Sequence, residues 1–288
     1  MIAVLGATGN TGRAVVKELK ALGQNPVAVV RNADKAREVL GADAKIAVAD
    51  LGDKAALEKA LKGAEAVFLT TNVNPQLAEQ NTNAIDAALA AGVKVLVRLS
   101  AGRAVVGLDS LAPSGRTHYE IDQRIRGLGI GWVILRPGLF MQNYLGQAAG
   151  IKNDGKLVNT APVDLGIAYI DVRDTGAIAA RILIDPKPHL GKEYEFTGKS
   201  VTLPQFADAF SQVLGKKVSY VPVTLEQNEQ AVRSRGLPDW LTTHMLAIAR
   251  ITATGGFSKE NTKPIRDIVG RDPITPKKFV EDFKAAFS

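Results

Sequence analysis

The chain contains no cysteine, and it has only three histidines in 288 residues. Without cysteine, disulfide bonds, catalysis by a thiol and zinc sites with cysteine ligands are excluded. The histidines, His118, His189 and His244, are far apart and show no metal-ligand spacing, so we expect no metal site. We expect His189 in a surface loop and His244 as a packing residue. The lack of cysteine also fits the cytoplasm, where we expect the protein.

Long hydrophobic runs are missing as well. No run approaches the roughly 18 apolar residues that cross a bilayer, and no basic segment followed by an apolar one marks a secretory signal. We therefore expect no membrane association. Apolar residues make up 46% of the chain and charged residues 23%, which is ordinary for a globular protein.

Positive charge exceeds negative charge, with a formal net charge of +7. The basic residues are scattered, however, without a polybasic run or an aromatic-interleaved RNA-binding pattern. We expect no nucleic-acid partner. The excess is better explained by an ordinary basic surface that also attracts a phosphorylated cofactor or an anionic substrate.

A glycine-rich turn follows the first apolar segment. Met1–Leu5 runs directly into Gly6-Ala7-Thr8-Gly9-Asn10-Thr11-Gly12. Gly6 permits a tight turn, Gly9 lets the backbone approach a pyrophosphate, and Gly12 lets the next helix pack closely on the strand. The helix start also directs free N–H groups and a partial positive charge at the ligand.

The surroundings of this turn strengthen the interpretation. The apolar spacing predicts a helix over 11–22, Gly23 suits its C-terminal cap, and 27–30 predicts a second strand. Together they complete a strand–helix–strand unit. We predict a dinucleotide site, the alternative being the same unit with a glycine turn and no ligand.

The end of the second strand bears on the cofactor. Arg31 stands where NAD enzymes commonly place an acidic residue, and a guanidinium suits a 2′-phosphate. Lys35 and Arg37 follow closely, but they equally fit a solvated helix face. Asp34 suits the N-cap of the next helix better than a ribose ligand. These residues favour NADP(H) over NAD(H).

Strands and helices continue to alternate up to about residue 137. This alternation predicts an α/β fold with a Rossmann-type, doubly wound parallel sheet. Ligands bind at the carboxyl ends of such strands. The residues expected at those ends are Gly6, Arg31, Asp50, Thr70, Ser100 and Arg136.

Beyond Pro137 the pattern loosens. Short strands at 167–172, 194–196 and 218–222 alternate with helices, of which 203–214 and 276–287 are amphipathic. We predict a dinucleotide-binding domain over 1–137. A smaller α+β lobe on the substrate side would cover 138–288, with one or two segments returning to the main sheet.

With the glycine turn and Arg31 in place, three further segments carry a family resemblance. They are Leu135–Asn143, which contains Arg-Pro-Gly, then Tyr169–Asp174 and Gly270–Pro273. The chain resembles NmrA-like NAD(P)-binding proteins, a group of atypical short-chain dehydrogenase/reductases. Within that group it is similar to NADPH-dependent quinone reductases and triphenylmethane dye reductases. The group also contains proteins that bind the cofactor and regulate others without obvious turnover.

The resemblance implies a set of cofactor residues. Gly6, Thr8, Gly9, Asn10, Thr11 and Gly12 would hold the pyrophosphate, and Arg31 the 2′-phosphate. Asp50 and Leu51 would border the adenine, although Asp50 is equally well a loop or cap carboxylate. Thr70, Thr71 and Asn72 would line the ribose and nicotinamide path. Asn143 and Tyr144 would lie near the nicotinamide, with Ser100 at the fifth strand end.

The catalytic pattern departs from that of the wider superfamily, which reduces carbonyls with a Tyr-x-x-x-Lys pair. Here Tyr119 is followed four residues later by the neutral Gln123, which cannot lower the pKa of a phenol as lysine does. The resemblance places His118 near the nicotinamide, where an imidazole could orient a substrate or relay a proton. The alternative is a histidine at the helix start, exposed to water.

These observations predict an NADPH-dependent reductase that transfers hydride to a quinone-like or conjugated small molecule. His118 or Tyr119 would assist proton transfer or the placement of the substrate. Such acceptors take hydride at an electron-poor carbon without a strong acid. The alternative is an NADP(H)-binding redox sensor that regulates a partner. An epimerase or dehydratase of nucleotide-sugars fits less well, since those enzymes need the Tyr/Lys pair. The expected partners are a small-molecule substrate and, in a homodimer, a second copy of the chain.

Overall fold

A computed structural model describes the whole chain, Met1 to Ser288. Its centre is a seven-stranded sheet in which every neighbouring pair is parallel. The strands follow the order β10 (Lys192–Phe196), β6 (Gly131–Pro137), β5 (Val95–Leu99), β4 (Ala66–Leu69), β1 (Ile2–Leu5), β2 (Val27–Val30) and β3 (Lys45–Val48). Since the central strands are buried on both faces, they read as continuous apolar runs.

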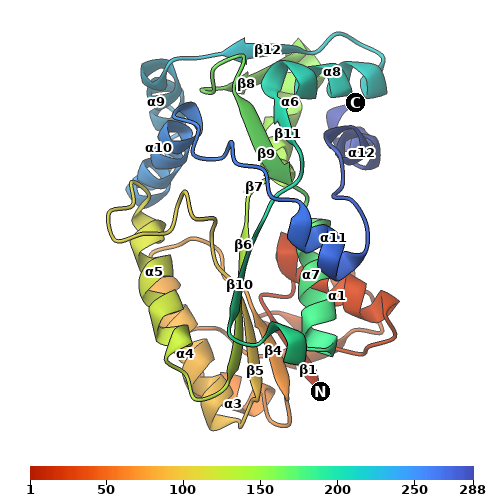
Figure 1. Cartoon of the computed structure of the whole chain (residues 1–288), viewed down its shortest axis with the longest axis vertical. Helices are drawn as coiled ribbons and strands as arrows, with labels where there is room; N and C mark the ends of the chain where they lie inside the picture. Colours follow the sequence, from red (N-terminus) through yellow and green to blue (C-terminus); the bar gives the residue numbers. More distant parts are fainter.

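Helices cover both faces of this sheet (Figure 1). One face carries α1 (Asn10–Ala21), α2 (Ala33–Leu40), α7 (Val172–Ile184) and α11 (Lys263–Val269). The other carries α3 (Lys54–Ala60), α4 (Leu77–Ala90) and α5 (Pro113–Arg126). A separate buried apolar cluster fills the space on each face. The predicted Rossmann-type, doubly wound α/β fold is therefore confirmed.

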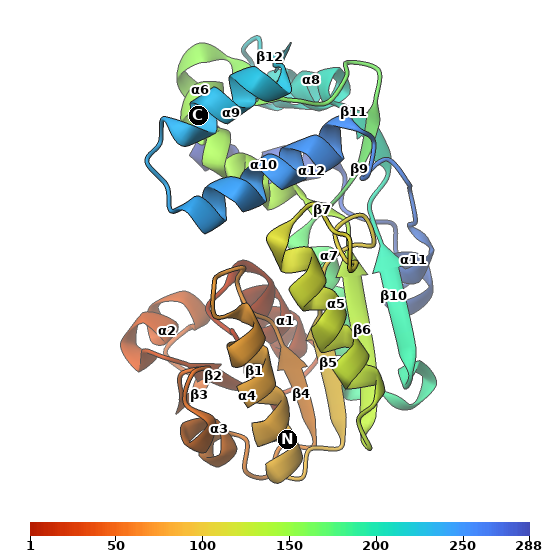
Figure 2. The same cartoon turned by 90° about the vertical axis from the view of Figure 1, so that its left-hand side faces the viewer.

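A second group of elements lies beyond the carboxyl ends of the central strands (Figure 2). It contains the sheet β11-β9-β7 and the parallel pair β12-β8. The strands are β7 (Leu139–Phe140), β8 (Lys156–Asn159), β9 (Gly166–Ile170), β11 (Ser200–Thr202) and β12 (Ser219–Pro222). The α-helices are α6 (Ala148–Asp154), α8 (Leu203–Leu214), α9 (Leu225–Arg233), α10 (Asp239–Ala253), α12 (Pro276–Asp282) and α13 (Lys284–Phe287). Two 3-10 segments are η1 (Met141–Gln147) and η2 (Lys187–His189). This group has its own buried core, which includes Phe206, Phe210, Phe279 and Phe287.

Part of the C-terminal half belongs to the main sheet. Strand β10 pairs with β6, and α7 packs against α1. Ile178, Phe196 and Ile265 join the same core cluster as residues of β1 and α1. Segments of the C-terminal half therefore return to the main sheet, as the sequence predicts. The division into two domains at residue 137 stays a prediction.

The caps explain where several elements begin and end. Gly23 follows α1 with a φ of +76°, and the carboxylate of Asp53 accepts from the Ala56 N–H at the start of α3. At α2, however, Asn32 is the N-cap, because its side chain accepts from the Lys35 N–H. The prediction of Asp34 as this cap is wrong; Asp34 pairs with Arg37 on the exposed face.

Helix α5 begins at Pro113, because proline is favoured in the first turn, and it ends before Gly127. The helix expected over 276–287 breaks at Phe283 into α12 and α13. The predicted helix over 203–214 is α8.

Candidate functional site

A pocket of about 460 Å³ lies at the carboxyl ends of β1, β2, β3 and β4. Most of the predicted cofactor residues line it together. They are Gly6, Thr8, Gly9, Asn10, Thr11, Gly12, Arg31, Asp50, Leu51, Thr70, Thr71, Asn72 and Asn143. The pocket thus lies at the strand ends where a doubly wound sheet binds its ligands.

The glycines of the turn serve different purposes. Gly6 has a φ of +72°, and a Cβ there would lie 2.3 Å from the Thr70 carbonyl oxygen. A Cβ on Gly12 would lie 2.2 Å from the Gly6 carbonyl oxygen. A Cβ on Gly9, which caps α1, would meet only the Gly6 carbonyl oxygen at 3.4 Å. The fold therefore requires glycine at positions 6 and 12, whereas at Gly9, which lines the pocket, the chain itself leaves room for a Cβ.

Arg31 and Asp50 face each other across the rim of the pocket. Nε of Arg31 lies 3.7 Å from Oδ2 of Asp50; the Arg31 side chain is largely exposed and that of Asp50 is about half exposed. Asp50 also accepts from the Gly52 N–H at 2.7 Å, so it serves its own loop as well. Lys35 and Arg37 are not among the lining residues. Arg31 is the cation available to an anionic group here.

Gln142 was not among the predicted residues, although it lies in the segment that carries the family resemblance. It lines the pocket and is only 7% exposed. Its Oε1 accepts from the Val172 N–H at 3.1 Å, while its buried Nε2 has no partner. Buried amide donors are rarely left unpaired, so this one is suited to a ligand bound in the pocket.

Several lining residues were not predicted. Val73 and Asn74 directly follow Asn72 in the β4–α4 connection. Gln80 in α4, Leu99 at the end of β5 and Val172 at the start of α7 come from separate elements, and only the tertiary structure brings these three to the site.

Ser100 and Tyr144, predicted to contact the cofactor, lie outside the pocket lining. Ser100 is buried and donates to Oδ2 of Asp122 at 2.7 Å. Tyr144 belongs to the second core, where its hydroxyl pairs with that of Tyr169 and its ring packs edge-on against Phe206. Burial raises the pKa of Tyr144 far above its usual range. The η1 turn directs Asn143 outward and Tyr144 inward.

His118 and Tyr119 point to different sides of α5. Tyr119 is partly exposed, and its hydroxyl accepts from Nε2 of Gln123 at 2.6 Å. His118 is only 6% exposed, so the alternative of a water-exposed histidine is wrong. Neither residue lines the pocket. Tyr119 and Gln123 thus share a face of the helix away from the buried groups, and the structure does not bring them to the site.

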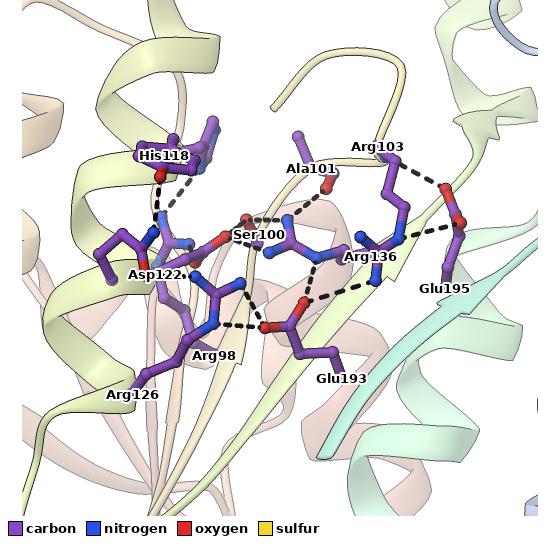
Figure 3. A network of polar contacts seen from close by, with 12 residues as sticks. Arg98, Ser100, Ala101, Arg103, His118, Asp122, Arg126, Arg136, Glu193 and Glu195 are labelled. Carbon is purple, nitrogen blue, oxygen red and sulfur yellow. Dashed lines mark hydrogen bonds and ion pairs between the residues drawn. The ribbon is translucent and has the colours of Figure 1, made fainter. Parts of the chain in front are cut away.

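A buried network of charges joins α5 to the sheet beside the pocket (Figure 3). Arg98 and Asp122 form a fully buried ion pair, and Nη2 of Arg136 lies 2.8 Å from Oδ2 of Asp122. Burial lowers the pKa of Arg98 to about 10, which leaves it charged at neutral pH. Nε of Arg136 also lies 3.0 Å from Glu193 on β10. The network holds β5, β6, β10 and α5 together.

The remaining histidines are placed away from the pocket. His189 belongs to η2, and its Nδ1 lies 2.8 Å from the Tyr194 hydroxyl in β10. Nδ1 of His244 lies 3.3 Å from Oγ of Ser114. No three acidic, histidine or cysteine side chains gather where they could hold a metal ion. None of the helices is both long and apolar enough to span a bilayer.

Sequence and structure comparisons identify relatives over nearly the whole chain. An NAD(P)H azoreductase of Xenophilus azovorans is 33% identical over 289 residues, covering 100% of this chain and 99% of the relative. Quinone oxidoreductase 2 of Escherichia coli is 35% identical over 279 residues, covering 96% of each.

The solved structure of the NADPH-dependent quinone oxidoreductase of Escherichia coli, in complex with NADPH, superposes with a TM-score of 0.86. It is 32% identical and covers 99% of this chain and 100% of that chain. The model of the NmrA-like family matches residues 1–275. By both its sequence and its architecture, the chain belongs to the NmrA-like family.

Proposed function

We propose that this protein is an NADPH-dependent oxidoreductase that reduces quinone-like or other conjugated small molecules. The single observation that carries the proposal is a pocket of about 460 Å³ at the strand ends, lined by the glycine turn and Arg31. Relatives named as azo and quinone reductases, 33% and 35% identical, support the same activity.

Three features of the pocket fit NADPH. The space beside Gly9 admits a pyrophosphate against the start of α1. The exposed guanidinium of Arg31 can bind the 2′-phosphate through charge-assisted hydrogen bonds. The unpaired Nε2 of Gln142 offers a buried donor to the cofactor. These residues would hold NADPH, which supplies the hydride when bound.

The lining also restricts the chemistry of the acceptor. It contains no histidine, lysine or tyrosine, and its one carboxylate, Asp50, stands at the rim beside Arg31, so the pocket offers no general acid apart from this ion-paired group. Leu99, Phe140 and Val172 provide apolar surface for a flat ring system. Quinones and conjugated dyes suit such a site, because they accept hydride without prior protonation.

The test is NADPH oxidation, followed by absorbance, with a panel of benzoquinones, naphthoquinones, azo dyes, triphenylmethane dyes and enones. We expect turnover with at least one quinone or dye, and its loss in Gly9→Asp. Gly129→Ala is the matched control, because nothing lies near a Cβ at that position. No oxidation across the panel would refute the proposal.

The same lack of a general acid favours a second candidate, an NADP(H)-binding redox sensor that regulates a partner. A sensor binds one redox form of the cofactor more tightly and has negligible turnover. Calorimetric titration with NADPH and NADP⁺, beside the turnover assay, separates the two candidates. We also propose a cytoplasmic location and a small-molecule partner; a homodimer and the lack of nucleic-acid binding stay predictions.

A further inference from the structure

The bond between Arg98 and His118 determines which ring nitrogen carries the proton. Nη2 of Arg98 lies 2.8 Å from Nδ1 of His118, and both residues are buried. A guanidinium has only N–H donors, so Nδ1 must be the acceptor. In an imidazolium both ring nitrogens are donors, which this contact does not permit. The ring is therefore neutral, with its hydrogen on Nε2.

We propose that Arg98 is a positioning residue that fixes His118 as a neutral Nε2–H donor, which hydrogen-bonds the substrate but does not transfer its proton. This inference rests on the proposed function for the identity of the substrate. It differs from an acid–base histidine because the ring keeps one tautomer and one charge throughout the reaction.

The groups that face His118 oppose a positive charge on it. They are Arg98 on β5, Arg136 on β6 and His244 on α10. The carboxylate of Asp122, one turn along the same helix, pairs with both arginines instead. Burial, and then the nearby arginines, hold the pKa of His118 well below its usual range.

The other ring nitrogen is free. Nε2 makes no hydrogen bond within the chain, so its donor is left for a ligand. Figure 3 shows the imidazole at the end of the network, with Arg98 on one side of it.

A chain of hydrogen bonds ties this histidine to the pocket wall. Nε of Arg98 donates to Oδ1 of Asn81 at 3.2 Å. Nδ2 of Asn81 in turn donates to Oγ1 of Thr71 at 3.0 Å, and Thr71 lines the pocket. The orientation of the imidazole is thus coupled to the wall of the cofactor pocket.

The chemistry follows from a donor that keeps its proton. Reduction of a quinone to a hydroquinone needs one hydride, for which NADPH is oxidised to NADP⁺, and one further proton at the anionic oxygen. Nε2–H stabilises the negative charge that develops on that oxygen. Water supplies the proton, because His118 releases none.

The tautomer is tested directly by long-range ¹H–¹⁵N NMR spectra of the protein labelled at histidine, recorded from pH 5.5 to 8.5 without cofactor. Three histidines give three ring signals, which His118→Gln, His189→Gln and His244→Gln assign. We expect His118 to show the Nε2–H pattern, unchanged over this range. An Nδ1–H pattern, or titration of His118 near pH 6.5, would overturn the proposal.

Arg98→Lys tests the positioning role, since lysine keeps the charge but offers a single, more mobile amine. We expect the His118 signal to become a mixture of tautomers, while the signals of His189 and His244 stay unchanged. A pure Nε2–H pattern in a folded Arg98→Lys protein would show that Arg98 does not fix the ring. If this variant does not fold, the wild-type spectra still test the tautomer, and an Nδ1–H pattern there would still overturn the proposal.

Kinetics with a benzoquinone test the donor. His118→Leu should lower kcat/KM about 100-fold, as loss of one oxyanion donor does. His118→Gln, which keeps an N–H, should lower it by less than about tenfold, with a ratio to wild type that is constant from pH 5.5 to 8.5. If the ratio of kcat/KM of His118→Gln to that of the wild type falls steeply below pH 6.5, His118 transfers a proton. Absence of all turnover would refute the proposed function, whereas the spectra test the tautomer independently.

Discussion

The Arg31 guanidinium and the Asp50 carboxylate stand 3.7 Å apart, Nε to Oδ2, at the adjoining ends of β2 and β3. Arg31 has 81% of its side chain exposed, so a phosphate can reach it without displacing a buried group. Asp50 keeps the guanidinium at the rim of the pocket and is itself held by the Gly52 N–H.

Arg31→Gln should therefore weaken NADPH binding about 10- to 100-fold, because a hydrogen bond to a charged group is worth about 1.5–3 kcal/mol. NADH binding should change little, since NADH lacks the 2′-phosphate. Dissociation constants from fluorescence titration test this. Arg37→Gln, which removes an exposed arginine paired with Asp34, is the control. An equal loss of affinity for NADPH and NADH would show that Arg31 does not bind the 2′-phosphate.

Two substitutions in the glycine turn should have separate effects, one on NADPH affinity and the other on the stability of the fold. Gly9→Ala should unfold close to the wild-type temperature but lose most NADPH affinity, because its Cβ occupies the space on the pocket side. Gly12→Ala should lose about 1–3 kcal/mol of stability, since its Cβ would overlap the Gly6 carbonyl oxygen. Thermal unfolding with and without NADPH measures both effects. Wild-type affinity in Gly9→Ala would place the pyrophosphate elsewhere.

Asp122→Asn should cost about 3–5 kcal/mol of unfolding free energy, because it leaves the buried Arg98 without a counter-charge and leaves Arg136 with Glu193 alone. Glu120→Gln on the same helix breaks an exposed pair with Arg116 and should cost at most about 1 kcal/mol. Urea denaturation of the two variants gives the comparison. Similar losses would mean that the buried network adds no stability.

The buried His118 should make the fold sensitive to acid. Its pKa is lowered in the folded state, mainly by burial, while in the unfolded chain it is about 6.5. Below pH 6.5 the unfolded state therefore binds one more proton, and stability falls as pH falls. Between pH 6 and 5 the slope from this residue approaches about 1.4 kcal/mol per pH unit.

His118→Gln removes this contribution and leaves the other titrating groups in place. Urea unfolding of both proteins at pH 7, 6 and 5 should show a steeper loss in the wild type. Parallel stability curves would mean that His118 takes up its proton equally in both states.

Much of the fold follows from local chemistry. The buried strands β1 and β4 are apolar throughout, and glycine or an Asx side chain marks the helix ends, as at Gly23 and Asp53. The pocket residues of the glycine turn follow from the same local pattern. These features depend on residues close together in the sequence, so sequence reasoning predicts them.

The buried network is different. Arg98 lies in the otherwise apolar β5, and its partner Asp122 lies 24 residues away on a helix. Nothing in the sequence around a charged strand residue indicates that its side chain is buried and paired. The opposite directions of Asn143 and Tyr144 likewise depend on the η1 turn, which no periodicity predicts.

The return of β10 to the edge of the main sheet has a consequence during synthesis. Residues 192–196 pair with 133–137, so the edge of β6 has no partner until about 60 further residues have been synthesised. Until then the nascent chain exposes an unpaired, apolar strand edge, which is a template for pairing with other chains. Completion of the sheet therefore depends on a long-range parallel pairing, which we expect to be a slow step of folding and the stage most in need of chaperones.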